Sequence, residues 1–149
     1  MVNEWAIKDM DALVQDATVK GAEVLTGGAP LERTGYYYPP TVLGNVPADA
    51  NILREEVFGP VAPIVSFSDD DEVVAKANDT EYGLVSYLYT QDIGRGMVIS
   101  ERLHAGMIGL NRGLVSDPAA PFGGSKQSGL GREGSHDGMM EYMEKKYIA

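Results

Sequence analysis

The sequence predicts an α/β fold in which a mostly parallel sheet is flanked by helices. Between residues 61 and 111, segments rich in β-branched and aromatic residues alternate with segments whose apolar residues recur at helical spacing. The order strand, helix, strand, helix, strand is typical of units with parallel pairing. With 149 residues and 44% hydrophobic residues, the chain is long enough for one ordinary domain with a sizeable core.

The composition limits the partners that the chain can have. The formal net charge of −10 opposes electrostatic attraction to nucleic acid and to anionic membranes. No apolar run approaches the roughly 20 residues that span a bilayer, and the first residues lack the basic and apolar regions of a signal peptide. We therefore expect a cytoplasmic protein with no membrane and no nucleic-acid partner. The absence of cysteine excludes disulfides, thiolate metal sites and a cysteine nucleophile.

The first segment predicts an amphipathic helix with Asn3 as its N-cap, ended by Lys20 and Gly21. Its apolar residues at helical spacing are Ala6, Met10, Leu13, Val14 and Ala17. Residues 22–25 predict a short exposed strand. Residues 36–43 are β-prone but contain two prolines, which suits an edge strand or the entrance to a strand. Because no basic residues are interleaved there, we assign the three adjacent tyrosines to packing.

The middle of the chain predicts three strands and two helices. Residues 61–67 form a strand in which Pro63 indicates an early or edge position. Ser68 followed by Asp71 predicts a capping-box-like helix start, and the acidic residues 69–72 suit a helix N-terminus without a metal ion. This helix extends to about residue 78. Strands are expected at 84–90 and 105–111, with a helix at 92–103 between them whose packing face carries Ile93, Met97 and Val98.

The last segment predicts a short helix lined on one side by Met139, Met140 and Met143, followed by the beginning of a strand at 145–148. His104 and His136 lie beside predicted helix ends, where an imidazole usually caps the helix or is solvated. Neither histidine has a cysteine or carboxylate at ligand spacing, so no metal site is expected.

Two runs of residues carry chemical information. The run PFGGSKQSGLGRE at 121–133 holds four glycines and predicts a shaped loop, since glycine permits positive φ and close approach of another backbone or a ligand. It lacks the spacing of a phosphate-binding Walker loop. The second run is EEVFGP at 55–60. Together, the two runs and their separation resemble signatures of the aldehyde dehydrogenase superfamily, and the likeness extends from Asn3 to Ile148.

The resemblance implies roles for particular residues. Glu56 matches the family glutamate that binds the nicotinamide ribose, and two carboxylate oxygens can accept hydrogen bonds from two adjacent hydroxyls. Phe58 matches the aromatic that holds the nicotinamide end of the cofactor, and Phe122 an aromatic at the mouth of the substrate tunnel. Residues 111–117 most resemble the succinate-semialdehyde dehydrogenase branch, in which Ser116 matches a serine that hydrogen-bonds the distal carboxylate. Arg132 and Glu133 match a pair that ties the glycine loop to neighbouring elements.

The resemblance also implies that residues 1–149 are the C-terminal portion of a catalytic domain, without the dinucleotide-binding domain. The family nucleophile is a cysteine, and no residue here matches it or the other reacting groups, so we assign no catalytic residue. We expect a parent enzyme that uses NAD or NADP on succinate semialdehyde, with glutarate and other semialdehydes left open. The chain alone is expected to bind no cofactor, to be inactive and to form homo-oligomers. The alternative is a stand-alone pseudoenzyme that acts as a binding or assembly module.

Overall fold

The computed structural model describes residues 1–149 and divides them into two compact units. Unit 1 comprises residues 1–67 and unit 2 comprises residues 68–149. Both combine helices with strands, which confirms the predicted α/β class. The strands lie in three small sheets rather than in one, and both parallel and antiparallel pairings occur.

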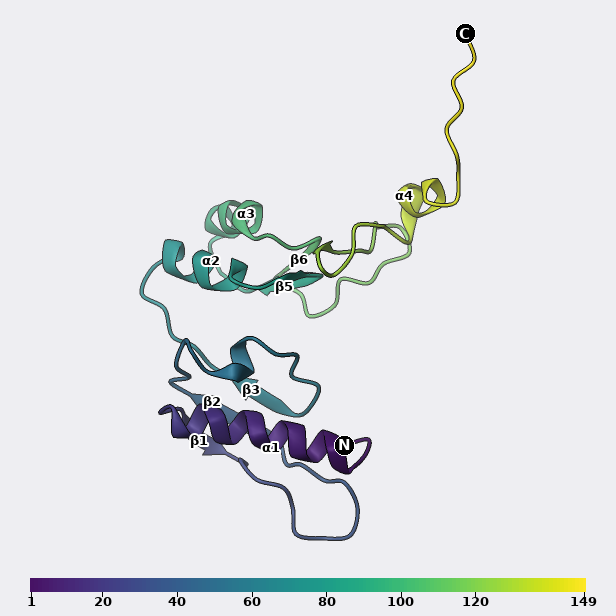
Figure 1. The fold of residues 1–149 in the computed structure, drawn as a ribbon. Coiled ribbons are helices and arrows are strands. Elements are labelled where there is room, and N and C mark those ends of the chain that lie inside the picture. The colour runs from purple at the N-terminus through teal and green to yellow at the C-terminus, as the bar shows by residue number, and fades with distance from the viewer. The chain divides into compact units, whose positions relative to one another are not determined.

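Unit 1 is a helix packed on a three-stranded sheet (Figure 1). Its elements in chain order are α1 (Glu4–Val19), β1 (Glu23–Thr26), β2 (Thr41–Gly44), the 3₁₀ turn η1 (Asn51–Leu53) and β3 (Val61–Pro63). The strand order is β1-β2-β3, antiparallel between β1 and β2 and parallel between β2 and β3. Strand β1 is exposed throughout, as its sequence predicts.

The predicted amphipathic helix is confirmed in α1. The side chain of Asn3 accepts a hydrogen bond from the Ala6 N–H at 2.9 Å, and Gly21 adopts a φ of 117° just after the helix. The buried residues of α1 are Met10, Leu13, Val14 and Ala17. They share one core with Leu43, Val46 and Ile52. The periodicity of the sequence therefore identifies the packing face of this helix correctly.

Strand β2 lies in the middle of its sheet, so the edge position allowed for residues 36–43 is wrong and the strand entrance is right. Both prolines precede the strand, and the first residue of β2, Thr41, donates its N–H to Pro60 O at 2.8 Å. Because neither proline needs to donate within the ladder, a central strand can follow them. Pro63 does end an edge strand, since β3 lies at one side of the sheet.

Unit 2 contains seven elements. They are α2 (Asp70–Asn78), β4 (Tyr82–Gly83), β5 (Val85–Leu88), α3 (Ile93–Arg102), β6 (Met107–Leu110), β7 (Ser125–Lys126) and α4 (Ser135–Met140). Strands β5 and β6 pair in parallel, connected through α3, as the sequence predicts. Strands β4 and β7 pair antiparallel, although residues 82–83 and 125–126 are far apart in the sequence.

The start of α2 differs from the prediction by one residue. Asp69, not Ser68, is the N-cap, and its side chain accepts a hydrogen bond from the Glu72 N–H at 2.8 Å. The Glu72 carboxylate in turn accepts from the Ser68 N–H and from the Ser68 hydroxyl. Hydrogen bonds from Lys76 and Ser68 lower the pKa of Glu72 to about 2. Asp69 and Glu72 therefore have local roles in the cap.

The apolar face predicted for α3 is wrong, because Ile93, Met97 and Val98 are all more than half exposed. The buried residues of this helix are Gly96 and Ile99. Gly96 lies close to the side chains of Leu110 and Thr90, so α3 packs on β6 through the side of the helix where the glycine has no side chain. Periodicity predicts a helix here, but the absent side chain of a glycine determines which side approaches the strand.

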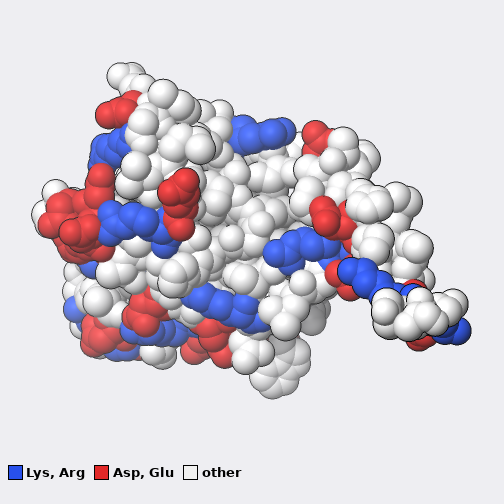
Figure 2. Space-filling view, turned by 90° about the horizontal axis from the view of Figure 1, so that it is seen from above, with Lys and Arg blue, Asp and Glu red and all other residues white.

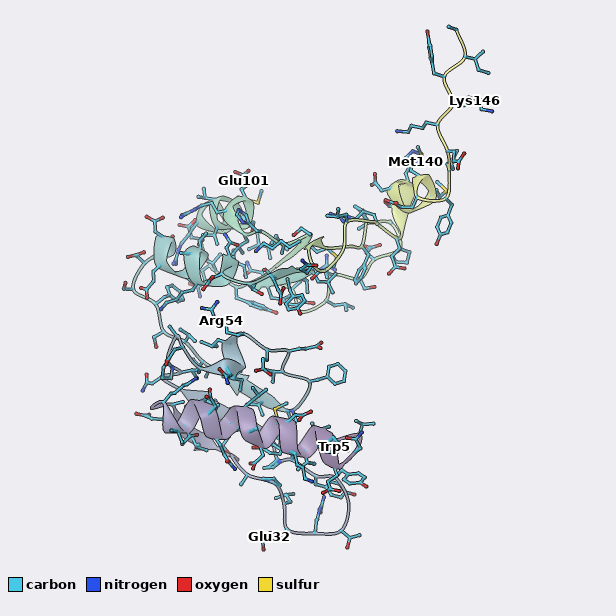
Figure 3. All side chains as sticks on the ribbon, in the orientation of Figure 1. Trp5, Glu32, Arg54, Glu101, Met140 and Lys146 are labelled. Carbon is cyan, nitrogen blue, oxygen red and sulfur yellow. The ribbon has the colours of Figure 1, made fainter.

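Two predictions for the C-terminal segment are also wrong. Helix α4 ends at Met140, so Met143 lies outside it, and Met139 and Met143 are exposed rather than packed together. Residues 145–148 form no strand, and Tyr147 and Ile148 are exposed by more than 80%. Figure 3 shows Lys146 on this extended chain after α4. A β-prone sequence forms a strand only where another strand lies alongside to take its hydrogen bonds.

Candidate functional site

Glu56 and Phe58 line one hollow on unit 1. The turn that carries them follows η1 and leads into β3, and the opposite wall is α1. The lining residues are Ala6, Asp9, Met10, Ala12, Leu13, Asn51, Glu55, Glu56 and Phe58. Phe58 is 81% exposed, so its ring is available to a ligand. The structure thus brings together the two residues predicted to contact the cofactor, and adds a helix face that the motif alone does not reveal.

Contacts with α1 hold this turn in place. The Asn51 N–H donates to the Asp16 carboxylate at 2.8 Å, and the Lys20 ammonium donates to Asp49 O at 2.8 Å. Hydrogen bonds from Lys20 and from the Asn51 N–H lower the pKa of Asp16. Gly59 packs against the tip of Met10, where an added Cβ would come within 2.6 Å of the methyl carbon. The chain before and after Glu56 is therefore anchored to one helix.

The charge of this hollow indicates which part of a dinucleotide it suits. Its charged lining residues are Asp9, Glu55 and Glu56, all acidic. A carboxylate can accept from the two hydroxyls of a ribose, and an exposed phenyl ring can cover the face of a nicotinamide ring. A diphosphate would be repelled, because no basic side chain lines the hollow. The residues present fit the nicotinamide-ribose end of a cofactor and do not fit its phosphates.

Ser116 and Phe122 line a second hollow, on unit 2. The other lining residues are Asp117, Pro118, Glu133 and Gly134. Ser116 is exposed, so its hydroxyl is open to a ligand. Phe122 and Glu133 form an isolated antiparallel bridge, with N–H···O distances of 2.7 and 2.8 Å between their backbones. This bridge closes the glycine loop on itself and fixes the backbone from which the Phe122 ring projects.

A lysine anchors the glycine loop to the helix ends of unit 2. Lys126, in the left-handed region at φ 54°, donates from Nζ to Asn78 O and to Thr80 O, both at 2.9 Å. These carbonyls lie at the C-terminal end of α2, where a cation is favoured by the helix dipole. The side chain of Asn78 donates to Arg102 O at 2.9 Å and accepts from the His104 N–H at 2.7 Å. One asparagine thus joins the ends of α2 and α3.

Two serines of the glycine loop add hydrogen bonds in the same region of unit 2. The Gly83 N–H donates to the Ser128 hydroxyl oxygen at 3.0 Å, and Ser125 Oγ donates to Gly83 O at 3.3 Å. No role for Asn78, Lys126 or either serine is predicted from the sequence. A positively charged residue inside a glycine loop is the one sequence signal that could have pointed to this anchor.

The glycines of the loop allow backbones to touch. A Cβ added to Gly106 would overlap the carbonyl oxygen of Gly123 and lie 2.7 Å from the Cα of Gly124. The glycine loop therefore approaches another backbone closely within unit 2, in the chain between α3 and β6. The backbones of these two segments therefore meet with no side chain between them.

The Arg132 side chain donates hydrogen bonds to carbonyl oxygens of the glycine loop itself. Its Nη1 atom donates to Gly124 O at 2.7 Å and to Gly131 O at 2.9 Å, and its backbone N–H donates to the Glu141 carboxylate at 3.3 Å. Glu133 takes part through its backbone, in the bridge to Phe122. The role of Arg132 and Glu133 is thus structural, as predicted, but they tie the loop mainly to itself, and only the Arg132 N–H reaches a residue beyond the loop.

Two ion pairs join α2 to α3. Arg95 binds Asp70 through two nitrogens, and Arg102 binds Asp71, so the acidic start of α2 faces the basic residues of α3. Hydrogen bonding to Arg95 lowers the pKa of Asp70. On the face shown in Figure 2, acidic and basic groups lie beside one another. The structure contains no group of three potential metal-ligating side chains, and no helix long and apolar enough to cross a bilayer.

A family model for aldehyde dehydrogenases matches residues 1–148. The chain belongs to the aldehyde dehydrogenase family. A succinate-semialdehyde dehydrogenase from Paenarthrobacter nicotinovorans is 49% identical over 148 residues, which are 99% of this chain and 33% of that protein. A glutarate-semialdehyde dehydrogenase from Pseudomonas putida is 47% identical, over 99% of this chain and 30% of that protein. The chain therefore spans about a third of the length of these relatives.

A solved structure supports the fold. The crystal structure of an Escherichia coli NADP-dependent enzyme matches with a TM-score of 0.94 and 46% identity, covering 99% of this chain and 31% of that one. The α/β arrangement is thus that of a portion of an aldehyde dehydrogenase. Within this portion, the hollow that holds Glu56 and Phe58 belongs to unit 1 and the hollow that holds Ser116 and Phe122 belongs to unit 2.

Proposed function

We propose that this chain is the C-terminal portion of an NAD(P)-dependent semialdehyde dehydrogenase, an oxidoreductase that converts an aldehyde to a carboxylic acid, with succinate semialdehyde as the favoured substrate. The observation that carries this proposal is the pairing of the predicted residues. Glu56 and Phe58 share one hollow, and Ser116 and Phe122 share another. The names of the relatives, which act on succinate and glutarate semialdehydes, support the same substrate class.

In this proposal Glu56 and Phe58 hold the nicotinamide end of the cofactor. The carboxylate accepts from the ribose hydroxyls, and the exposed ring limits the positions of the nicotinamide. Such restriction matters because hydride transfer requires the donor and acceptor carbons to be held close together and aligned. The acidic lining of the hollow assigns the phosphates of the cofactor, and the choice between NAD and NADP, to other parts of the enzyme.

Phe122 and Ser116 receive the aldehyde. Phe122 covers the apolar part of the substrate, and the Ser116 hydroxyl donates to its distal carboxylate. A single hydroxyl holds a carboxylate weakly, and Asp117 and Glu133 in the same hollow add negative charge. The cation that neutralises the substrate therefore comes from a part of the enzyme outside these residues.

The chain alone does not oxidise aldehydes and binds no cofactor in this proposal. The family reaction starts from a cysteine thiolate, and the chain contains no cysteine. We place the parent enzyme in the cytoplasm as a homo-oligomer. Many large apolar side chains of the chain are exposed, which is consistent with surfaces that other protein covers; examples are Val2, Trp5, Val19, Phe58, Leu130, Tyr142, Tyr147 and Ile148. Figure 3 shows Trp5 on α1.

A chimera tests the proposal. The corresponding third of the Paenarthrobacter nicotinovorans relative is replaced by residues 1–149, and reduction of NAD and NADP is followed with succinate and glutarate semialdehydes. We expect turnover by the chimera and none by the chain alone. Glu56→Gln should raise the KM for the cofactor, while Glu32→Gln, an exposed change on another loop of unit 1, should not. A folded chimera that shows no turnover would reject the proposal and favour a non-catalytic binding module.

A further inference from the structure

Asn111 makes an unusual connection at the end of β6. Its backbone is in the left-handed region, at φ 54°, and its own N–H donates to Leu88 O at 2.8 Å. Its side-chain Oδ1 accepts from the Thr90 N–H at 2.8 Å, and its Nδ2 donates to Thr90 O at 2.8 Å. Both backbone groups of Thr90 are therefore satisfied by one carboxamide.

The Asn111 carboxamide makes the hydrogen bonds that the backbone of a further strand residue would make. Strands β5 and β6 pair in parallel from Val85 with Met107 to Leu88 with Leu110. Beyond Leu110, the side chain of Asn111 continues the pairing by binding Thr90, while the main chain turns away in a conformation that Asn adopts more readily than most residues. The sheet is thus extended by one hydrogen-bonded pair at the very residue where the backbone leaves it.

The segment that leaves the sheet here leads to the substrate hollow. Residues 112–115 connect Asn111 to Ser116, and beyond Ser116 hydrogen bonds hold the chain again. The Ala119 N–H donates to the Asp117 carboxylate at 2.9 Å, and the Ser135 N–H donates to Pro118 O at 3.0 Å. Ser116 is therefore an exposed residue in a short segment that is anchored on both sides.

We propose that Asn111 is a positioning residue for substrate selection: its carboxamide, bound to Thr90, fixes the direction in which residues 112–116 leave the sheet and so places the Ser116 hydroxyl in the substrate hollow. This inference rests on the proposed role of Ser116. Asn111 itself does not line the hollow, so its effect on the substrate is transmitted through the backbone.

The chimera described above separates positioning from general stability. We compare kcat and KM for succinate semialdehyde with those for butanal, which has the same four carbons and no carboxylate. Asn111→Gly tolerates the left-handed backbone and removes both side-chain hydrogen bonds. We expect a KM for succinate semialdehyde raised about tenfold, since two hydrogen bonds that order the segment are lost, with kcat unchanged and the KM for butanal changed by less than about twofold.

Two further variants provide controls. Asn111→Asp retains an acceptor for the Thr90 N–H and loses the donor to Thr90 O, so its KM should lie between those of the wild type and Asn111→Gly. Asn45 also has a left-handed backbone, at φ 50°, and lies in unit 1. Asn45→Gly makes the same chemical change away from the segment and should leave the ratio of the two KM values unchanged.

Amide exchange in the 149-residue chain gives a readout that does not need activity. In Asn111→Gly the Thr90 N–H should exchange at least about tenfold faster, whereas the Met107 N–H, which donates to Leu84 O within the sheet, should be unaffected. Equal increases of KM for both aldehydes, or an unchanged KM despite faster Thr90 exchange, would overturn the inference. An inactive wild-type chimera rejects the proposed function instead. In that case, unchanged exchange of the Thr90 N–H in Asn111→Gly still rejects the positioning role of Asn111.

Discussion

The two units of this chain are held together in different ways. Unit 1 has a continuous apolar core in which α1 meets β2, η1 and the chain around them, with Leu43 and Ala50 fully buried. Buried large apolar residues are few in unit 2: Val74, Ile99 and Met107. In unit 2, hydrogen bonds of Asn78 and Lys126 and direct contacts between glycine backbones instead hold the ends of α2 and α3 and the glycine loop together.

This difference shows two ways to fix a candidate binding residue. In unit 1 the turn with Glu56 and Phe58 is positioned by a helix that burial holds against the sheet. In unit 2 the loop with Phe122 is positioned by directional hydrogen bonds, which specify geometry but contribute only about 1 kcal/mol each to stability. We therefore expect unit 1 to respond mainly to lost apolar volume, and unit 2 to added volume and altered polar contacts.

The largest effect should follow from Leu43→Ala. Leu43 is 0% exposed in the core of unit 1, and the change leaves a cavity that its neighbours fill only in part. We expect the free energy of unfolding of unit 1 to fall by about 3 kcal/mol, measured by urea denaturation with circular dichroism. Leu130→Ala, at a position 83% exposed in unit 2, is the matched control and should change stability by less than about 0.5 kcal/mol. A loss below about 1 kcal/mol for Leu43→Ala would remove the contrast between the units.

A smaller effect is expected from adding one methyl group to unit 2. In Gly106→Ala the new Cβ overlaps the Gly123 backbone, which has no side chain that could rotate away. We expect a loss of about 2 kcal/mol and faster amide exchange across residues 123–128, followed by NMR. Gly131→Ala is the control, because its nearest neighbour lies 3.8 Å from the added Cβ. Equal stabilities of the two variants would show that the contact at Gly106 relaxes freely.

The smallest effect concerns the cap of α2. The folded pKa of Glu72 is lowered from 4.5 to about 2, so its stabilising contribution is fully present above pH 4.5 and is lost as the pH falls toward 2. In urea titrations, the wild type should exceed Glu72→Gln in midpoint at pH 6, and this difference should shrink on acidification and in 1 M salt. Glu101→Gln, an exposed change on α3 (Figure 3), controls for the loss of one carboxylate. A difference that grows at low pH would contradict the assignment.

The helices were the most predictable part of the fold. The N-cap of α1, the termination of α1 at Gly21 and the four buried positions of α1 follow from residues close together in the sequence. The same reasoning misplaced the packing face of α3 and expected a strand at 145–148. Both errors have one cause: local sequence predicts the type of an element, whereas burial and strand pairing depend on which distant segment lies alongside.

The sequence by itself determined the α/β alternation, both ends of α1 and the two runs that hold Glu56, Phe58 and Phe122, because each depends on neighbours within a few positions. Only the tertiary structure decided that Lys126 binds the end of α2, that Asn111 binds Thr90, and that Gly106 touches Gly123. Each of these contacts joins residues more than 15 positions apart, through one polar side chain or through a glycine backbone. Such groups leave no periodic signal, so their partners are known only once the chain is folded.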